Sequence, residues 1–173
     1  MPYRTETEIY PDVMAWLERI LRERFSKAKV DVRNTHGSSP NHYIRQNGLL
    51  NYFHSNIWQT YDIRVDITGF VKSKNHSGLV FVECKTVAIT LLHLSQLLGY
   101  SRVALPLFSY LLSSAGIGST LKSLITKYDR TDILEYYWPK GEIPRRIIVA
   151  QWDKNSRGID SNTVLPPGFS GQI

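Results

Sequence analysis

The stretch YDIRVDITGFVKSKNHSGLVFVECKT, residues 61–86, carries the clearest alternation of apolar and polar side chains in this sequence. Within the predicted strand 61–71, residues 61–68 alternate, so their apolar side chains share one face and their polar side chains share the other. A polar turn over residues 72–78 follows, and residues 79–87 form a second, more apolar run. Two such runs around a polar turn predict an antiparallel hairpin.

The predicted hairpin brings chemically useful side chains together. Folding the chain at the polar turn places Asp66 roughly opposite Glu83, Cys84 and Lys85. Opposed residues of a hairpin lie about 4.5–5.5 Å apart. Because side chains alternate along a strand, Glu83 and Lys85 share a face while Cys84 points to the other. Two carboxylates and one ammonium are therefore expected in one place.

This trio suits the hydrolysis of an anionic phosphodiester. A divalent cation neutralises the phosphate and lowers the pKa of bound water. Mg²⁺ takes oxygen ligands, which Asp66, Glu83 and the backbone carbonyl of Cys84 would supply. Lys85 would hold the attacking water and stabilise negative charge. The alternative is a surface ion pair worth about 0–1 kcal/mol, but carboxylates at the end of an apolar strand are costly unless they are used or paired.

The sequence resembles the PD-(D/E)xK nuclease superfamily in three places: Asp66 in RVDITG, Glu83-Cys84-Lys85 in VFVECKT, and Gln96 with Tyr100 in the Q-x-x-x-Y pattern of its RecB-like branch. The resemblance implies a restriction-endonuclease-like core with the element order α-β-β-β-α-β. It also implies Mg²⁺ or Mn²⁺ as cofactor and DNA as partner. Gln96 and Tyr100 would line the site as part of the catalytic set.

Two features of the resemblance leave alternatives open. Family members carry an acidic residue on the first helix, which serves as a further metal ligand. Glu8 is the candidate by position, and Glu6 is the rival. Val65 stands where the family name has proline. The layout after the core is similar to Holliday-junction-resolvase-like and Mrr-like members, which does not select a substrate.

Basic side chains outside the hairpin strands are the candidates for binding nucleic acid. The chain carries a net charge of +6, which favours an anionic partner. Lys72 and Lys74 at the hairpin turn would contact phosphates, which supply most non-specific affinity. Arg45 and Tyr43 would do likewise, with bases stacking on the aromatic ring. The alternative for the turn is a simple solvated loop.

The rest of the chain predicts an α/β domain, a central mixed β-sheet flanked by helices. We interpret residues 1–173 as a single domain, with a long loop or insertion at 34–56 and an irregular tail at 153–173. The other predicted elements are, in chain order, a helix over 5–25 whose regular part starts near Tyr10, a possible strand over 29–33, a helix over 88–105, a strand over 107–113, a short helix over 119–128, and strands over 132–136 and 146–152.

Composition narrows the class of protein. The single cysteine, Cys84, excludes an internal disulfide and predicts a reducing, intracellular and cytoplasmic setting. No membrane segment, signal peptide, zinc-type histidine spacing or small-molecule cofactor is expected. We therefore expect a Mg²⁺-dependent deoxyribonuclease, an endonuclease rather than an exonuclease, with a homodimer compatible with paired cuts. The alternatives are a non-cleaving nucleic-acid-binding protein on the same fold and a basic structural or assembly protein.

Overall fold

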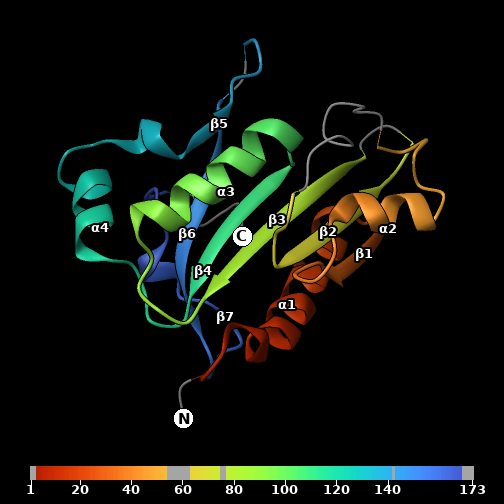
Figure 1. The fold of residues 1–173 in the computed structure, drawn as a ribbon. Coiled ribbons are helices and arrows are strands. Elements are labelled where there is room, and N and C mark those ends of the chain that lie inside the picture. The colour runs from red at the N-terminus through yellow and green to blue at the C-terminus, as the bar shows by residue number, and fades with distance from the viewer. Residues whose placement is uncertain (1–2, 54–62, 75–76, 142, 169–173) are drawn as a thin grey trace.

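The computed structural model describes residues 3–53, 63–74, 77–141 and 143–168. Within these ranges the chain forms a mixed, open sheet of seven strands flanked by helices, so the α/β prediction is confirmed (Figure 1). The strands are β1 (Lys29–Asn34), β2 (Ile67–Lys72), β3 (Gly78–Lys85), β4 (Phe108–Ser113), β5 (Glu135–Tyr137), β6 (Arg145–Asp153) and β7 (Gly158–Ile159). The helices are α1 (Tyr10–Arg24), α2 (Pro40–Gln46), α3 (Leu91–Ala104) and α4 (Ser119–Thr126), with 3-10 turns at Glu6–Glu8, Thr131–Leu134 and Ser161–Thr163.

The strand order is β1-β2-β3-β4-β6-β5, with β7 beside β6. The first three strands pair antiparallel, as the hairpin pattern predicts. β4 and β6 are parallel to β3, and α3 makes the crossover from β3 to β4. Parallel strands need such a crossover and are usually buried on both faces, which explains the nearly unbroken apolar runs of β4 and β6.

The sheet separates two apolar cores. On one face α1 packs through Val13, Trp16 and Leu17 against the side chains of β1, β2, β3, β4 and β6. On the other face Ile44 of α2, Leu97 of α3 and Leu121 of α4 pack against the side chains that the strands direct to that face. Each strand alternates between the cores, as its period of two requires.

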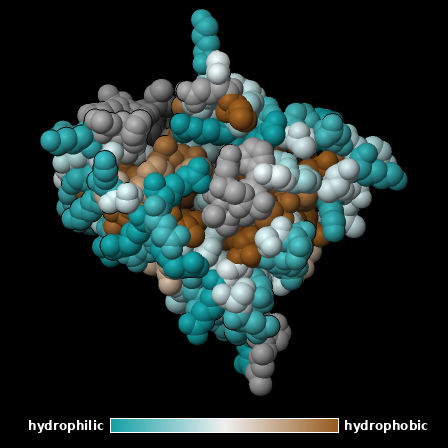
Figure 2. All heavy atoms as spheres, turned by 180° about the vertical axis from the view of Figure 1, so that it is seen from behind, coloured by the Kyte–Doolittle hydropathy of each residue, from teal (hydrophilic) through white to brown (hydrophobic). Residues whose placement is uncertain are grey.

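The surface on the side away from the viewer of Figure 1 mixes two kinds of residue. Hydrophilic side chains cover much of it, and hydrophobic residues show between them in separate areas (Figure 2). This is the ordinary balance of a folded domain, because apolar atoms supply much of any protein surface.

Three sequence predictions need correction. The first hairpin strand begins at Ile67, because residues 63–66 make no ladder and 61–62 lie outside the described residues. The interval 34–56 is not simply a loop: Pro40 starts α2 from its first turn, and residues 54–56 lie outside the description. The tail at 153–173 contains β7 and a 3-10 turn, and its Leu165 pairs with Val149 of β6 and is buried.

The core between α1 and the sheet gives a direct test of the fold. Leu17 is fully buried there, so Leu17→Ala should lower the free energy of unfolding by about 2–5 kcal/mol, as measured by urea denaturation. Leu92→Ala removes the same atoms from a residue that is 74% exposed and should change stability by less than about 0.5 kcal/mol. Equal losses in both variants would contradict this packing.

Candidate active site

The candidate site lies at one edge of the sheet, where β2 begins and β3 ends. Ile67 pairs with Val82, so Asp66, the residue before β2, faces Glu83 by continuation of the register. The 3-10 turn and start of α1, the segment after β1 and the start of α3 approach the same edge. Residues distant in the sequence therefore meet around the two carboxylates.

Three polar groups contact the Asp66 carboxylate, which is only 4% exposed. The Tyr10 hydroxyl donates to its Oδ1 at 2.6 Å, and Nδ1 of His36 lies 3.0 Å from the same oxygen. The backbone N–H of Cys84 donates to Oδ2 at 2.8 Å. Hydrogen bonds keep a buried carboxylate satisfied, so this side chain has a fixed orientation.

Thr35 fixes the main chain around Asp66. The Thr35 N–H donates to the Asp66 carbonyl at 2.8 Å, and the Thr35 hydroxyl donates to the carbonyl of Val65 at 2.7 Å. Both contacts continue the β1–β2 edge beyond the last ladder pair. The backbone and the carboxylate of Asp66 are thus positioned independently.

Glu83 and Lys85 share the face of the sheet that carries α3, as the alternation predicts. The Lys85 ammonium lies 3.0 Å from Oε1 of Glu83 and 3.3 Å from Oε2 of Glu6. Glu83 is 5% exposed, and the Lys85 side chain is 12% exposed. One ammonium therefore serves two carboxylates in a poorly solvated place.

The electrostatics of the site favour an added positive charge. Burial, and then repulsion from Asp66, raise the pKa of Glu83 to about 7, although Lys85 opposes the shift. Burial alone would lower the pKa of Lys85, but attraction to Glu83 and the hydrogen bond that Lys85 donates to it outweigh burial, so that pKa is raised. Lys85 stays a cation at neutral pH and is a poor free base.

Cys84 contributes its backbone to the site rather than its thiol. Its side chain is fully buried in the α1 core, and burial raises the pKa of the thiol, which makes it a poor nucleophile. The Lys85 carbonyl accepts from Ser114 on the β4 side. Because backbone groups alternate in direction along a strand, the Cys84 carbonyl faces the Asp66 side, as its N–H does.

The donor set fits a hard divalent cation. Mg²⁺ is usually bound through one or two carboxylates plus waters, rather than by an all-protein cage. Asp66 and Glu83 supply such carboxylates, and the repulsion between them is the kind that a cation relieves. Among the described residues no group of three or more His, Cys, Asp or Glu side chains is arranged to hold a metal. Asp66 and Glu83 are the side chains that would hold such an ion.

The structure separates the two candidate acids on the first helix. Glu6 contacts Lys85, whereas the Glu8 carboxylate accepts from the backbone N–H of Arg4 and is exposed. The acid beside the site is thus Glu6, two residues earlier than position alone suggests, in the 3-10 turn that precedes α1.

Gln96 and Tyr100 lie on α3. No hydrogen bond in the described part of the chain joins either to Asp66, Glu83 or Lys85; Gln96 is exposed and Tyr100 packs against the α3 core. His93, one turn before Gln96, is nearer: its Nδ1 accepts from the N–H of Thr90 and burial, then Lys85, lower its pKa. Their role in the site remains a proposal.

The predicted nucleic-acid contacts lie on the β1–β2 side of the sheet. Tyr43 packs against Phe70, its hydroxyl donates to Asp31, and Arg33 stacks over its ring, so it is not an open platform for bases. The Lys72 ammonium lies 3.8 Å from the centre of the Tyr52 ring. The remaining two candidates, Arg45 and Lys74, are exposed.

Sequence reasoning missed Tyr10 and His36. Tyr10 occupies an apolar position of α1, and its ring is buried while its hydroxyl reaches Asp66. His36 follows β1 and contacts both Tyr10 and Asp66. The sequence carries no local signal for His36, because its approach to Asp66 depends on the pairing of β1 with β2.

The raised pKa of Glu83 predicts how stability depends on pH in the absence of metal. A carboxyl that is protonated more easily in the folded state contributes stability that is fully present below its ordinary pKa of 4.5 and is lost as the pH rises through about 7. The Tm of the wild type in EDTA should therefore fall relative to that of Glu83→Gln between these pH values and then level off. A Tm difference that is constant with pH would show that Glu83 titrates normally.

Comparisons with protein-family models, with curated proteins and with solved structures gave no match for this chain. No helix among the described residues is long and apolar enough to cross a membrane. What can be said about function therefore rests on the geometry and chemistry of the site.

Proposed function

We propose that this protein is a Mg²⁺-dependent nuclease that hydrolyses phosphodiester bonds in DNA. The observation that carries the proposal is the pair of buried carboxylates, Asp66 and Glu83, on facing strands, with the Lys85 ammonium 3.0 Å from Glu83. Two carboxylates and a cation at one strand end are the groups that metal-assisted attack on a phosphate requires.

The order of elements supports the same proposal. α1 precedes three antiparallel strands, and α3 crosses to the parallel strand β4. This order resembles the restriction-endonuclease-like core of the PD-(D/E)xK superfamily, with α2 inserted between β1 and β2. In that resemblance the acids at the start of β2 and the end of β3 are the catalytic ones.

Each residue has a role that follows from its contacts. Bound Mg²⁺ would neutralise the phosphate and lower the pKa of the attacking water. Asp66 and Glu83 would hold the cation, with the Cys84 carbonyl on the same side. Tyr10 and the Cys84 N–H fix the direction of the Asp66 oxygens. Lys85, kept protonated by Glu83, would orient the water and stabilise the negative charge that develops.

Replacing the central residues tests the proposal. Asp66→Asn and Lys85→Ala should each lower the rate of Mg²⁺-dependent cleavage by at least about 10²-fold, because each removes a charge that acts on the transition state. The assay compares linear, supercoiled, single-stranded and four-way-junction DNA in Mg²⁺, Mn²⁺ and EDTA. Asp132→Asn is the matched control, since Asp132 is an exposed aspartate paired with Arg130.

The outcomes separate the alternatives. Cutting that needs metal and is lost in both variants supports the nuclease, and the preferred DNA form identifies the subclass. If no DNA is cut while wild type and Asp66→Asn bind DNA equally, the protein is a non-cleaving binder. If no salt-sensitive DNA binding occurs, the basic surface serves another partner.

The two acids of the first turn provide a finer test. Glu6→Gln should lower the cleavage rate by about tenfold, because it removes one of the two carboxylates that position Lys85. Glu8→Gln, the same change two residues away, should leave the rate within about twofold. If Glu8→Gln lowered the cleavage rate more than Glu6→Gln, the first-helix acid of the site would be Glu8.

A further inference from the structure

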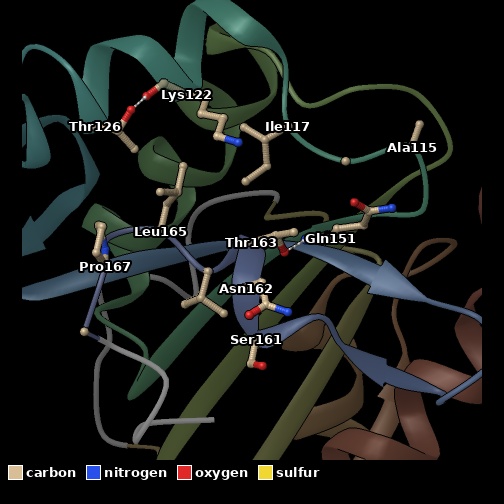
Figure 3. A pocket seen from close by; sticks show the side chains of 13 residues that line it. Ala115, Ile117, Lys122, Thr126, Gln151, Ser161, Asn162, Thr163, Leu165 and Pro167 are labelled. Carbon is tan, nitrogen blue, oxygen red and sulfur yellow. Dashed lines mark hydrogen bonds between the residues drawn. The ribbon is translucent and has the colours of Figure 1, made fainter.

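A cavity of about 450 Å³ lies beyond the carboxylates, between α4, the β4–α4 loop and the segment after β7 (Figure 3). This volume is within the range of roughly 300–1,000 Å³ found for small-molecule sites. Lys122 extends into it from α4, while Gln151 and Asn162 belong to β6 and to the 3-10 turn after β7.

The cavity lies on the same edge and face of the sheet as the candidate site. Lys85 pairs with Ser113 of β4, and Ser113 pairs with Gln151 of β6, so the three residues stand in one row. Neighbouring strands are about 4.8 Å apart, which puts Gln151 about 10 Å from Lys85. Parallel strands gather ligands at their carboxyl ends, where all three residues lie.

The polar groups of the cavity are available for a ligand. Within the described ranges the Lys122 ammonium has no carboxylate partner, and the Gln151 side-chain amide makes no hydrogen bond. The Asn162 amide donates to Asp160, which leaves its carbonyl oxygen as an acceptor. A cation and two amides are thus presented together.

The rest of the wall is mixed, because apolar side chains share it with the hydroxyl residues Thr126, Ser161 and Thr163. Ile117 and Leu165 line the cavity together with Pro167. A free phosphate would leave these side chains uncovered, and an apolar ligand would leave the ammonium and amides unpaired at a cost in free energy. A ligand that satisfies both parts carries a negative charge, polar groups that can bond to the amides, and some apolar surface.

We propose that this cavity binds one nucleotide of the DNA strand that is cut. This inference rests on the proposed nuclease function. The base lies against Ile117 and Leu165, as flipped bases lie between apolar side chains in other pockets. The amides of Gln151 and Asn162 bond its edge, since such amides match base donors and acceptors. Lys122 contacts a phosphate.

The spacing sets which nucleotide is bound. A DNA strand advances about 3.4 Å per nucleotide in a duplex, so about 10 Å corresponds to about three positions from the phosphate at Lys85. The site therefore selects a strand that can release a base from the stack close to the cut. That selection favours DNA with unpaired nucleotides near the cleavage point.

Fluorescence of 2-aminopurine tests this without cutting. The base analogue is placed at successive positions of a DNA oligonucleotide, single-stranded and duplex, and its unstacking is followed as a rise in fluorescence in EDTA. Wild type and Asp66→Asn should give the rise at one position. Lys122→Ala and Asn162→Ala should lose it and bind the oligonucleotide about tenfold more weakly.

Two exposed residues provide matched controls. Lys127→Ala, at the other end of α4, and Asn155→Ala, in the turn between β6 and β7, make the same chemical changes away from the cavity and should keep the signal. An equal rise in all four variants, or none at any position, overturns the proposal. Binding of free dAMP that depends on Lys122, with no response from any oligonucleotide, would assign the cavity to a free nucleotide and also overturn it.

The same protein separates this inference from the function on which it rests. Mg²⁺-dependent cutting by a wild type that gives no position-specific fluorescence rejects the nucleotide cavity alone. A position-specific signal that needs Lys122, from a protein that cuts no DNA, rejects the nuclease alone. Mg²⁺-dependent cutting together with a position-specific signal that needs Lys122 supports a nuclease that binds one base near its cut.

Discussion

The antiparallel pairing of β2 with β3, in the register that opposes Ile67 and Val82, is the constraint on which the candidate site depends. Side chains alternate along a strand, so a slip of one residue would turn Glu83 and Lys85 toward the α1 core and Cys84 toward the site. Val82 on one face and Phe81 on the other are both fully buried, which makes that slip costly. The packing of the two apolar cores therefore determines where the charged side chains lie.

Burying the charges is expensive, and the hydrogen bonds around them compensate only in part. Asp66 contacts the Tyr10 hydroxyl, the Cys84 N–H and His36, whereas Glu83 has Lys85, which it shares with Glu6. Burial and repulsion from Asp66 outweigh the attraction of Lys85, so the pKa of Glu83 is raised and the site gains from a cation. Removing one partner of such a group leaves a buried charge unpaired, so stability and chemistry are coupled here. The neutral variant of Glu83 separates the two because it keeps the side-chain shape.

The fold was largely predictable from the sequence because its signals are local. Alternation indicated the hairpin and the shared face of Glu83 and Lys85, and the helix that begins at Tyr10 was expected from Pro11 in its first turn. The contacts of Tyr10 and His36 with Asp66 were not predictable, because they depend on β1 lying beside β2. Polarity alone made the tail after β6 look irregular, whereas Leu165 pairs with that strand and is buried. Long-range pairing overrides local composition at such places.

Parallel strands connect the candidate site with the cavity beyond it. Since β3, β4 and β6 run in one direction, their carboxyl ends carry Lys85, Ser113 and Gln151 in a single row along the edge of the sheet. Ser113 is buried and bonds to the carbonyl of Val87, so the middle of the row is closed by backbone and only its two ends present polar side chains. A ligand that uses both ends must therefore be long and must bridge the closed middle. A single small molecule of the cavity's size does not meet this requirement, whereas a nucleic-acid strand, with charge repeated along its length, does.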